Sequence, residues 1–330
     1  MNNFEYGQPE NIDQALQQLD TPGAVLKAGG VDLLDLMKEG IAAPKRLVNV
    51  RNLTELKFIE GDSKKGVRIG PSVTLAEIAG SQNLKGSYDC LVQAAEGAAT
   101  PQIRNMATIG GNICQRPRCW YFRSDDFDCA RKGGSVCYAV DGENQYHSIF
   151  NNSDGCVIVN PSSMAVALMA LDAKIKISNG KDKKQVSVNE FLVAPAKDIT
   201  KEHILEKGDL ITEIELPKMN TNAISFYFKQ KEKQACDWPL AEVAVVLEMN
   251  GKMCKSARVL LGAAAPLPIR SEAAEKVLTG QTISLGTAKS AAEAALKDAT
   301  PLSRNAYKVH IFRAVIARSI CWAVGIDPLA

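Results

Sequence analysis

The sequence lacks long hydrophobic runs. Its longest apolar stretches, such as 164–171 and 241–247, are far shorter than the roughly 20 residues that cross a bilayer. It also lacks an excess of charge: 39 basic and 37 acidic residues give a formal net charge of +2, and no basic run offers the phosphate-neutralising surface of a nucleic-acid-binding protein. The sequence therefore predicts neither a membrane span nor a nucleic-acid partner.

A secretory signal is missing as well. The residues from Met1 to Tyr6 do not combine positive charge with a following apolar segment. We therefore expect a cytoplasmic protein, or a periplasmic one only if a partner subunit carries the export signal. With 46% hydrophobic and 23% charged residues, the composition is typical of globular proteins and argues against a disordered or fibrous chain.

The length of 330 residues suits two or three domains. The residue pattern predicts units over 1–58, 59–218 and 223–330, with a polar linker at 218–222. Because apolar residues recur with helical spacing in some segments and alternate or form runs in others, we expect an α+β protein. Helices are predicted at 12–19, 33–37, 75–79, 88–99, 164–171, 272–278, 287–296 and 304–324. Strands are predicted at 24–28, 46–50, 67–69, 156–159, 174–177, 210–216, 225–229, 241–249 and 255–261.

Two Gly–Gly pairs lie where the phosphates of a cofactor could bind. In the first loop a predicted strand runs through Gly29 and Gly30 directly into a helix, and the second loop spans 108–112. Backbone amides in such loops can face an anion, because glycine permits a close approach and a helix N-terminus favours negative charge. Neither loop matches the G-x-G-x-x-G fingerprint, so a classical Rossmann site is not predicted. Either pair alone could instead be a tight turn that binds nothing.

The nine cysteines are unevenly placed. Five of them fall in one stretch, which contains Cys114, Cys119, Cys129, Cys137 and Cys156. An odd count and a reducing compartment disfavour a complete disulfide framework, so metal ligation is the better interpretation. The pairs at two-to-four-residue spacing that zinc sites usually show are absent, whereas iron–sulfur clusters tolerate irregular spacing. A cluster, a structural zinc ion and uncoordinated thiols all remain open, and spacing does not reveal which of the five thiols would be the odd one.

Basic residues lie among these cysteines. They are Arg116, Arg118, Arg123, Arg131 and Lys132. Cations near a negatively charged cluster would stabilise it, but each of them could equally be a solvated loop charge. The histidines His147, His203 and His310 are dispersed, so we expect structural roles for them and predict no catalytic side chain.

At these residues the sequence resembles the FAD-binding medium subunit of the xanthine dehydrogenase (molybdenum hydroxylase) family, over essentially the whole chain. The similarity lies in the AGG loop at 28–30, the TIGGN loop at 108–112 and the stretch QRPRCWYFR at 115–123. It implies a two-subdomain FAD-binding fold of the vanillyl-alcohol oxidase (PCMH) type, followed by a C-terminal α+β domain of the CO dehydrogenase flavoprotein type.

The resemblance also implies which residues hold the cofactors. For FAD they are Lys27, Ala28, Gly29, Gly30, Val31, Asp32, Leu33, Thr108, Ile109, Gly110, Gly111, Asn112 and Lys229. The cysteine-rich stretch is similar to a subgroup with an additional [4Fe–4S] cluster, and this similarity implies the ligands Cys119, Cys129, Cys137 and Cys156, with Cys114 packed beside the flavin. Two positions depart from the family: Val31 stands where threonine is usual, and Ser163 where aspartate is frequent.

The implied function is electron relay. The chain would be the FAD and [4Fe–4S] subunit of an aldehyde or xanthine-type oxidoreductase, in a heterotrimer or a dimer of heterotrimers with a molybdenum-cofactor large subunit and a [2Fe–2S] small subunit. An external electron carrier would exchange electrons with it. The alternative within the family is the β subunit of 4-hydroxybenzoyl-CoA reductase, in which electrons run toward the substrate. The alternative from another class is a zinc-stabilised binding module without redox activity.

Overall fold

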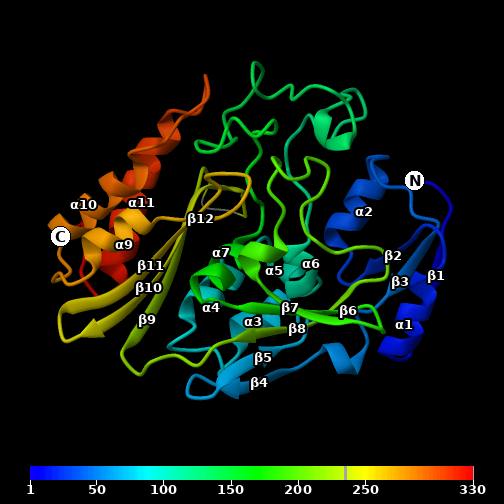
Figure 1. The fold of residues 1–330 in the computed structure, drawn as a ribbon, viewed down its shortest axis with the longest axis horizontal. Helices are drawn as coiled ribbons and strands as arrows, with labels where there is room; N and C mark the ends of the chain where they lie inside the picture. The colour runs from blue at the N-terminus through cyan, green and yellow to red at the C-terminus, as the bar shows by residue number, and fades with distance from the viewer. Residues whose placement is uncertain (234–235, 330) are drawn as a thin grey trace.

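The computed structural model describes residues 1–233 and 236–329. Within these ranges the strands form a three-stranded, a five-stranded and a four-stranded sheet, one in each of the three predicted units (Figure 1). Helices are interspersed in the first two units and follow the sheet in the third. The predicted α+β class is confirmed. No helix in the described ranges is long and apolar enough to span a membrane.

The N-terminal unit is a small parallel sheet with two helices. Its strands are β1 (Glu5–Gly7), β2 (Ala24–Lys27) and β3 (Arg46–Asn49), in the order β1-β3-β2, and its helices are α1 (Ile12–Leu19) and α2 (Val31–Lys38). Because β2 and β3 are parallel, their carboxyl ends at Lys27 and Asn49 lie side by side. The chain enters α2 just beyond Lys27, and in open α/β sheets ligands bind outside these strand ends.

The middle unit is an antiparallel sheet covered by helices. Its strands are β4 (Ile59–Asp62), β5 (Gly66–Ile69), β6 (Lys174–Ser178), β7 (Lys183–Ser187) and β8 (Leu210–Leu216), in the order β4-β5-β8-β6-β7. The helices are α3 (Leu75–Gly80), α4 (Asp89–Glu96), α5 (Pro101–Arg104), α6 (Ile109–Ile113), α7 (Ser163–Ala170) and α8 (Val188–Phe191), and a 3-10 turn at Thr54–Leu56 precedes this unit. Helix α7 is buried on almost every side because it lies between this unit and the C-terminal sheet.

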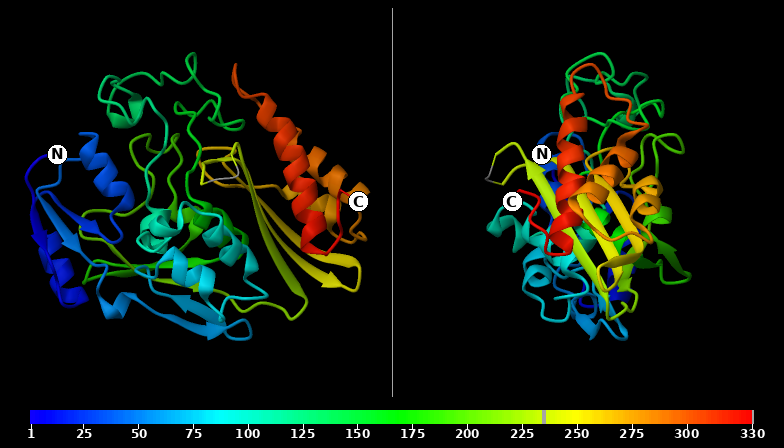
Figure 2. Two further views of the ribbon diagram at one scale, coloured as in Figure 1. Left: turned by 180° about the vertical axis from the view of Figure 1, so that it is seen from behind. Right: turned by 90° about the vertical axis from the view of Figure 1, so that its left-hand side faces the viewer.

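The C-terminal unit is an antiparallel sheet with helices on one face and the middle unit on the other. Its strands are β9 (Ala223–Lys231), β10 (Pro239–Asn250), β11 (Met253–Gly262) and β12 (Ile269–Arg270). Helices α9 (Glu272–Leu278), α10 (Leu285–Leu296) and α11 (Tyr307–Ala323) cover the outer face (Figures 1 and 2), whereas α4 and α7 pack on the inner one. Strand β10 is therefore buried on both faces, which explains its nearly continuous apolar run.

The cysteine-rich insertion, from about 114 to 156, rises from the middle unit as an irregular loop (Figure 1). Its regular structure is a 3-10 turn at Ala130–Lys132 and one bridge between Cys129 and Val136. The predicted strand at 156–159 is wrong. This segment is tied to the rest by separate bonds, from Ser148 N–H to the Val157 carbonyl (2.9 Å) and from Asn160 N–H to the Ala265 carbonyl (3.0 Å), so no strand ladder forms.

Candidate functional site

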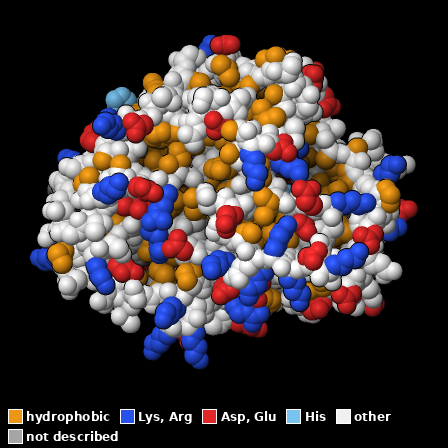
Figure 3. Space-filling view, in the orientation of Figure 1, with side chains coloured by type: hydrophobic (Ala, Val, Ile, Leu, Met, Phe, Trp, Pro, Cys, Tyr) orange, Lys and Arg blue, Asp and Glu red, His pale blue; other side chains and the backbone are white. Residues whose placement is uncertain are grey.

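A cleft of about 1040 Å³ lies between α2, α6 and the C-terminal sheet. It slightly exceeds the roughly 300 to 1,000 Å³ that ligand pockets usually have, so it can hold a large cofactor. Figure 3 shows this face hollowed between α2 and α6, with hydrophobic side chains visible in the hollow. Of the residues predicted to hold FAD, those lining the cleft are Lys27, Ala28, Gly29, Gly30, Val31, Asp32, Leu33, Thr108, Gly110, Gly111, Asn112 and Lys229.

The first glycine loop presents unused backbone amides to the cleft. Gly30 is the N-cap of α2 in a left-handed conformation (φ 77°), and no side chain caps this end of the helix. In the described part of the chain, the amides of Gly30 to Leu33 have no protein acceptor. A helix start with free N–H groups and a positive dipole end is suited to bind a phosphate. The sequence predicted this run from strand through glycines into a helix, and the binding of a phosphate here stays a prediction.

Gly29 brings the two glycine loops together. A Cβ atom added at Gly29 would lie 2.1 Å from the carbonyl oxygen of Met106, which directly precedes the second loop. No side chain fits in that space, so the end of β2 packs directly on the backbone of the second loop. The close contact makes both loops part of one wall of the cleft.

The second glycine loop does not offer the amides that we expected from its sequence. Its residues begin helix α6, and Thr108 caps this helix by accepting a bond from Gly111 N–H (3.2 Å). The amides of Ile109 and Gly110 donate to the carbonyls of Val73 (2.9 Å) and Pro71 (3.0 Å). These amides are therefore used by the protein itself. Ile109 is buried in the core and does not line the cleft.

The second loop presents to the cleft the open space at Gly111 and the side-chain amide of Asn112. A Cβ atom at Gly111 would meet only the hydroxyl of Thr108 within 4 Å, so the space before Gly111 is open. Asn112 accepts a bond from Ser162 through its oxygen (2.7 Å), which leaves its NH₂ group to donate. This loop can therefore admit a ligand closely at Gly111 and donate to it from Asn112.

Lysines lie on two sides of the cleft. The ammonium group of Lys27 is 3.4 Å from the side-chain oxygen of Asn49, at the carboxyl ends of β2 and β3. Lys229, on β9, lies 3.5 Å from the carbonyl of Gly97, and burial lowers its pKa. Positive charge thus faces the cleft from the N-terminal unit and from the C-terminal sheet.

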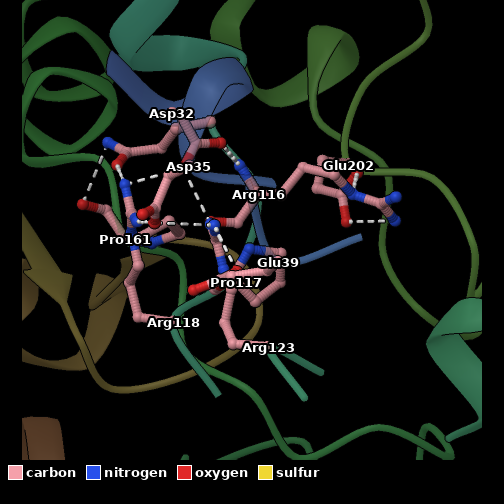
Figure 4. Close-up of polar contacts among 10 residues, drawn as sticks. Asp32, Asp35, Glu39, Arg116, Pro117, Arg118, Arg123, Pro161 and Glu202 are labelled. Carbon is pink, nitrogen blue, oxygen red and sulfur yellow. Dashed lines mark hydrogen bonds and ion pairs between the residues drawn. The ribbon is translucent and has the colours of Figure 1, made fainter. Parts of the chain in front are cut away.

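Ion pairs clamp the cysteine-rich insertion onto α2 (Figure 4). Asp32, in the first turn of α2, accepts a bond from the backbone amide of Arg116 (2.8 Å) and pairs with Arg118 and Arg123 (2.7 Å each). Arg118 also stacks on Trp238, with its guanidinium carbon 4.7 Å from the ring centroid. These arginines are therefore not the solvated loop charges that the sequence left open.

Glu202 holds a second part of the insertion. It pairs with Arg116 (2.9 Å) and with the buried Arg131 (2.8 Å), which also donates to the carbonyls of Ile199 and Lys201. Asp32 and Glu202 together fix the insertion to both walls of the cleft.

Replacing Asp32 by asparagine is expected to loosen this clamp. The variant keeps the size of the side chain but removes the charge that faces Arg118 and Arg123, so about 2–3 kcal/mol of stability should be lost, between the values typical of exposed and of buried pairs. Urea unfolding measures the loss, and limited proteolysis shows whether cleavage starts in the insertion. Asp13→Asn, in the exposed first turn of α1, is the matched control and should change neither. Equal stability of the two variants would contradict the clamp.

Four cysteines converge in the insertion. Cys119, Cys129, Cys137 and Cys156 line one small cavity of about 20 Å³, together with His147. All four cysteines are free thiols. Cys114, the fifth cysteine, lies instead in the wall of the large cleft. The structure thus separates the cysteine that spacing alone could not.

Neighbouring groups shift the acidity of thiols in this cavity. Burial raises the pKa of Cys119 to about 11, although the amides of Phe122 and Tyr121 act in the opposite direction. The thiol of Cys156 and the amides of Val157, Ala139 and Val140 lower the pKa of Cys137 to about 6. Four cysteine thiolates are the ligand set of most iron–sulfur clusters. In the described residues no three His, Cys, Asp or Glu side chains are arranged to hold one metal ion. The cavity has room for about a water molecule, which is less space than a four-iron cluster occupies.

His147 is the site residue that sequence reasoning missed. Its Nε2 atom lies 3.2 Å from the sulfur of Cys119, and its ring is 5.5 Å from that of Trp120. Burial, with the charge of Lys308, lowers the pKa of His147 to about 4, so the ring is neutral at physiological pH. His147 lies far from Cys119 along the chain, so no local sequence pattern indicated that the two residues meet.

Comparison with known proteins identifies the family. Residues 2–219 match the FAD binding domain in molybdopterin dehydrogenase, and residues 226–323 match the CO dehydrogenase flavoprotein C-terminal domain. The chain is 33% identical over 307 residues to the aldehyde oxidoreductase FAD-binding subunit PaoB of Escherichia coli K12, covering 92% of this chain and 93% of that protein. It is 25% identical over 301 residues to the carbon monoxide dehydrogenase medium chain of Hydrogenophaga pseudoflava, covering 90% and 88%.

Solved structures show the same fold. The carbon monoxide dehydrogenase of Hydrogenophaga pseudoflava has a chain that superposes with a TM-score of 0.76 at 24% identity, covering 98% of both chains. A chain of quinoline 2-oxidoreductase from Pseudomonas putida 86 gives a TM-score of 0.76 at 22% identity, covering 98% and 97%. The expectation of an FAD-binding domain followed by a flavoprotein C-terminal domain is confirmed.

These matches cover both parts of the chain and agree with the cleft that the two glycine loops build. They support an oxidoreductase subunit rather than the alternative of a zinc-stabilised binding module without redox activity. The chain therefore belongs to the family of FAD-binding subunits of molybdenum hydroxylases, and it is an oxidoreductase subunit.

Proposed function

We propose that this chain is the FAD and [4Fe–4S] electron-relay subunit of an aldehyde or xanthine-type molybdenum hydroxylase. The observation that carries the proposal is the convergence of four cysteines in one cavity, next to a cleft with free amides at a helix start. The name of the PaoB relative, an aldehyde oxidoreductase subunit, favours an aldehyde as the substrate of the complex.

Different residues of the cleft would contact different parts of FAD. The free amides of Gly30 to Leu33 would bind the diphosphate, since the start of α2 attracts negative charge. Gly111 would allow close approach, Asn112 would donate a hydrogen bond, and Lys229 would place positive charge near the ring system. Val31 has no hydroxyl group, so only the backbone amides would donate hydrogen bonds to the diphosphate here. When bound, FAD exchanges one or two electrons and so connects one-electron with two-electron carriers.

The four cavity cysteines, Cys119, Cys129, Cys137 and Cys156, would hold the cluster. The clamp between Asp32 and the arginines of the insertion would keep these sulfurs at a constant distance from the flavin site, because Asp32 belongs to the helix whose amides face the diphosphate. This chain then needs no general acid or base for the substrate, whose chemistry takes place on a partner subunit.

The proposed partners are a molybdenum-cofactor large subunit and a [2Fe–2S] small subunit, in a heterotrimer or a dimer of heterotrimers, with an external electron carrier. Several relatives are named as medium chains or FAD-binding subunits, which supports membership of a larger enzyme. The β subunit of 4-hydroxybenzoyl-CoA reductase remains the alternative, and the direction of electron flow in the purified complex separates the two. A cytoplasmic location stays a prediction.

Absorbance and metal content of the purified protein test the proposal. Prepared without oxygen, together with its partner subunits, the chain is expected to contain one FAD and about four irons of its own, with flavin bands above a broad iron–sulfur shoulder. Because the small subunit adds iron, the chain is also expressed alone and its iron measured separately. Bound zinc in place of iron would contradict the cluster, and absence of flavin would contradict the assignment of the cleft.

A further inference from the structure

Glu242 is a fully buried acid beside the flavin cleft, on β10. One of its carboxyl oxygens accepts bonds from the hydroxyl of Tyr227 (2.8 Å) and from the hydroxyl of Ser163, which lines the cleft. The other oxygen, Oε2, is buried and has no hydrogen-bond partner among the described residues. If Glu242 served only to join β10 to α7, one carboxyl oxygen would be enough. Burying the second oxygen without a hydrogen-bond partner costs free energy.

The neighbouring strands make room for the carboxyl group and place a charge near it. Glu242 lies opposite Lys229 on β9 and opposite Gly262 on β11, and residues opposite each other point to the same face of a sheet. A Cβ atom at Gly262 would lie 2.5 Å from Oε2 of Glu242, so the glycine leaves space for the carboxyl group. Glu242 therefore shares a sheet face with Lys229, which lines the cleft.

The groups around Glu242 come from three elements. Helix α7 contributes the hydroxyl of Ser163, β9 contributes Tyr227 and Lys229, and α11 contributes the charge of Lys308. The neighbour on β11 is Gly262, which has no side chain. The ammonium group of Lys308 donates to the carbonyls of His147 (2.8 Å) and Ala263 (2.7 Å).

Their burial changes their acidity. Burial raises the pKa of Glu242, and it lowers the pKa of Lys229 and brings that of Lys308 to about 7. A buried acid whose pKa is raised in this way is suited to change its protonation state in response to a nearby charge.

We propose that Glu242 binds a proton when the flavin in the cleft is reduced, and that Ser163 connects it to the cleft. The inference rests on the proposed function, because FAD must occupy the cleft. Reduction adds two electrons from a reductant and one proton from water to the flavin, so the ring system gains one negative charge. That charge favours the neutral form of a nearby carboxyl group. An ionised Glu242 therefore takes one further proton from water, and no bond between heavy atoms changes.

The pH dependence of the flavin reduction potential tests this inference. FAD-loaded protein, purified with its partner subunits, is titrated by spectroelectrochemistry from roughly pH 5 to pH 9, the range of raised carboxyl pKa values. In one part of the pH range, Glu242 is ionised in the oxidised protein and protonated in the reduced protein. Reduction there takes up one further proton per two electrons, so the equilibrium constant for reduction changes by a further factor of ten per pH unit. This adds about 30 mV per pH unit to the fall of the potential.

Glu242→Gln should lack this additional slope. At low pH Glu242 is neutral, as glutamine is, so the two curves should nearly coincide. At high pH the potential of the variant should lie above that of the unaltered protein, because no carboxylate opposes the added electrons. Glu213→Gln, which removes a buried carboxyl paired with Arg68 and Lys176 in the five-stranded sheet, should keep the slope. Parallel curves for Glu242→Gln and the unaltered protein would overturn the proposal.

The infrared difference spectrum on reduction supplies a readout that needs no variant. With ¹³C-labelled glutamate, the unaltered protein should gain a protonated-carboxyl band that shifts with the label, and absence of this band across the titrated range would also overturn the proposal. If the unaltered protein binds no FAD, the proposed function fails. If it binds FAD and shows neither the additional slope nor the band, only the role of Glu242 fails.

Discussion

Replacing Cys129 by serine is expected to remove most of the iron from this chain and to leave its FAD in place. Cys129 lines the cavity with Cys119, Cys137 and Cys156, and it does not line the flavin cleft. A serine hydroxyl is a poor substitute for a thiolate, so a four-iron cluster loses one of its four ligands. Iron bound by the chain expressed alone should fall from about four to well below two per chain, while the FAD content stays near one.

Cys114→Ser is the control for this prediction. Cys114 belongs to the same stretch of sequence, but it lines the flavin cleft, and burial raises its pKa to about 12. Its sulfur lies outside the cavity that Cys119, Cys129, Cys137 and Cys156 line, so it is not positioned as a ligand. Its variant should keep the iron. Full iron in Cys129→Ser, or loss of iron in Cys114→Ser, would refute the ligand set.

Replacing Gly29 by alanine is expected to weaken FAD binding about tenfold or more. The new Cβ atom would lie 2.1 Å from the carbonyl oxygen of Met106, and both partners are backbone, so one loop must move. Overpacking of this kind typically costs about 1–3 kcal/mol, and 1.4 kcal/mol corresponds to a tenfold change in affinity. Because the amides next to Gly29 line the cleft, the displacement falls on the proposed phosphate site. Fluorescence titration of the apoprotein with FAD measures the change.

Gly80→Ala is the matched substitution. Gly80 is the last residue of α3, and a Cβ atom there meets no atom within 4 Å. Alanine favours helix more than glycine does, so this variant should bind FAD as the unaltered protein does and should be no less stable. If Gly29→Ala also bound FAD with unchanged affinity, the two loops would not form one phosphate-binding wall.

The first glycine loop could be predicted from the sequence, and the role of the second could not. A strand that runs through two glycines into a helix is a local pattern, and the free amides of Gly30 to Leu33 follow from it. The amides of Ile109 and Gly110, by contrast, are used by carbonyls of Val73 and Pro71, more than thirty residues earlier in the chain. No local pattern contains that information.

The cysteine-rich stretch shows the same division. Its composition indicated metal ligation, and the resemblance to a family implied four ligands, but spacing left five equivalent candidates. In the structure Cys114 follows α6 and turns into the cleft, while the other four meet beyond the clamp of Asp32 and the arginines. The position of Glu242 beside the cleft could not be predicted from the sequence, because the residue stands in an apolar run that indicates only a buried strand.

The sequence by itself determined the class of fold, the strand–glycine–helix geometry of the first loop, the absence of a membrane span among the predicted segments and, through its similarity to a family, FAD as a cofactor. These depend on neighbours within one turn or one strand, or on motifs that are contiguous in the chain. Only the tertiary structure decided which thiols meet, which amides are already used and which acid lies beside the flavin cleft. Those outcomes depend on contacts between segments far apart in the chain, and such contacts arise when three sheets pack together and bury polar groups that must find partners.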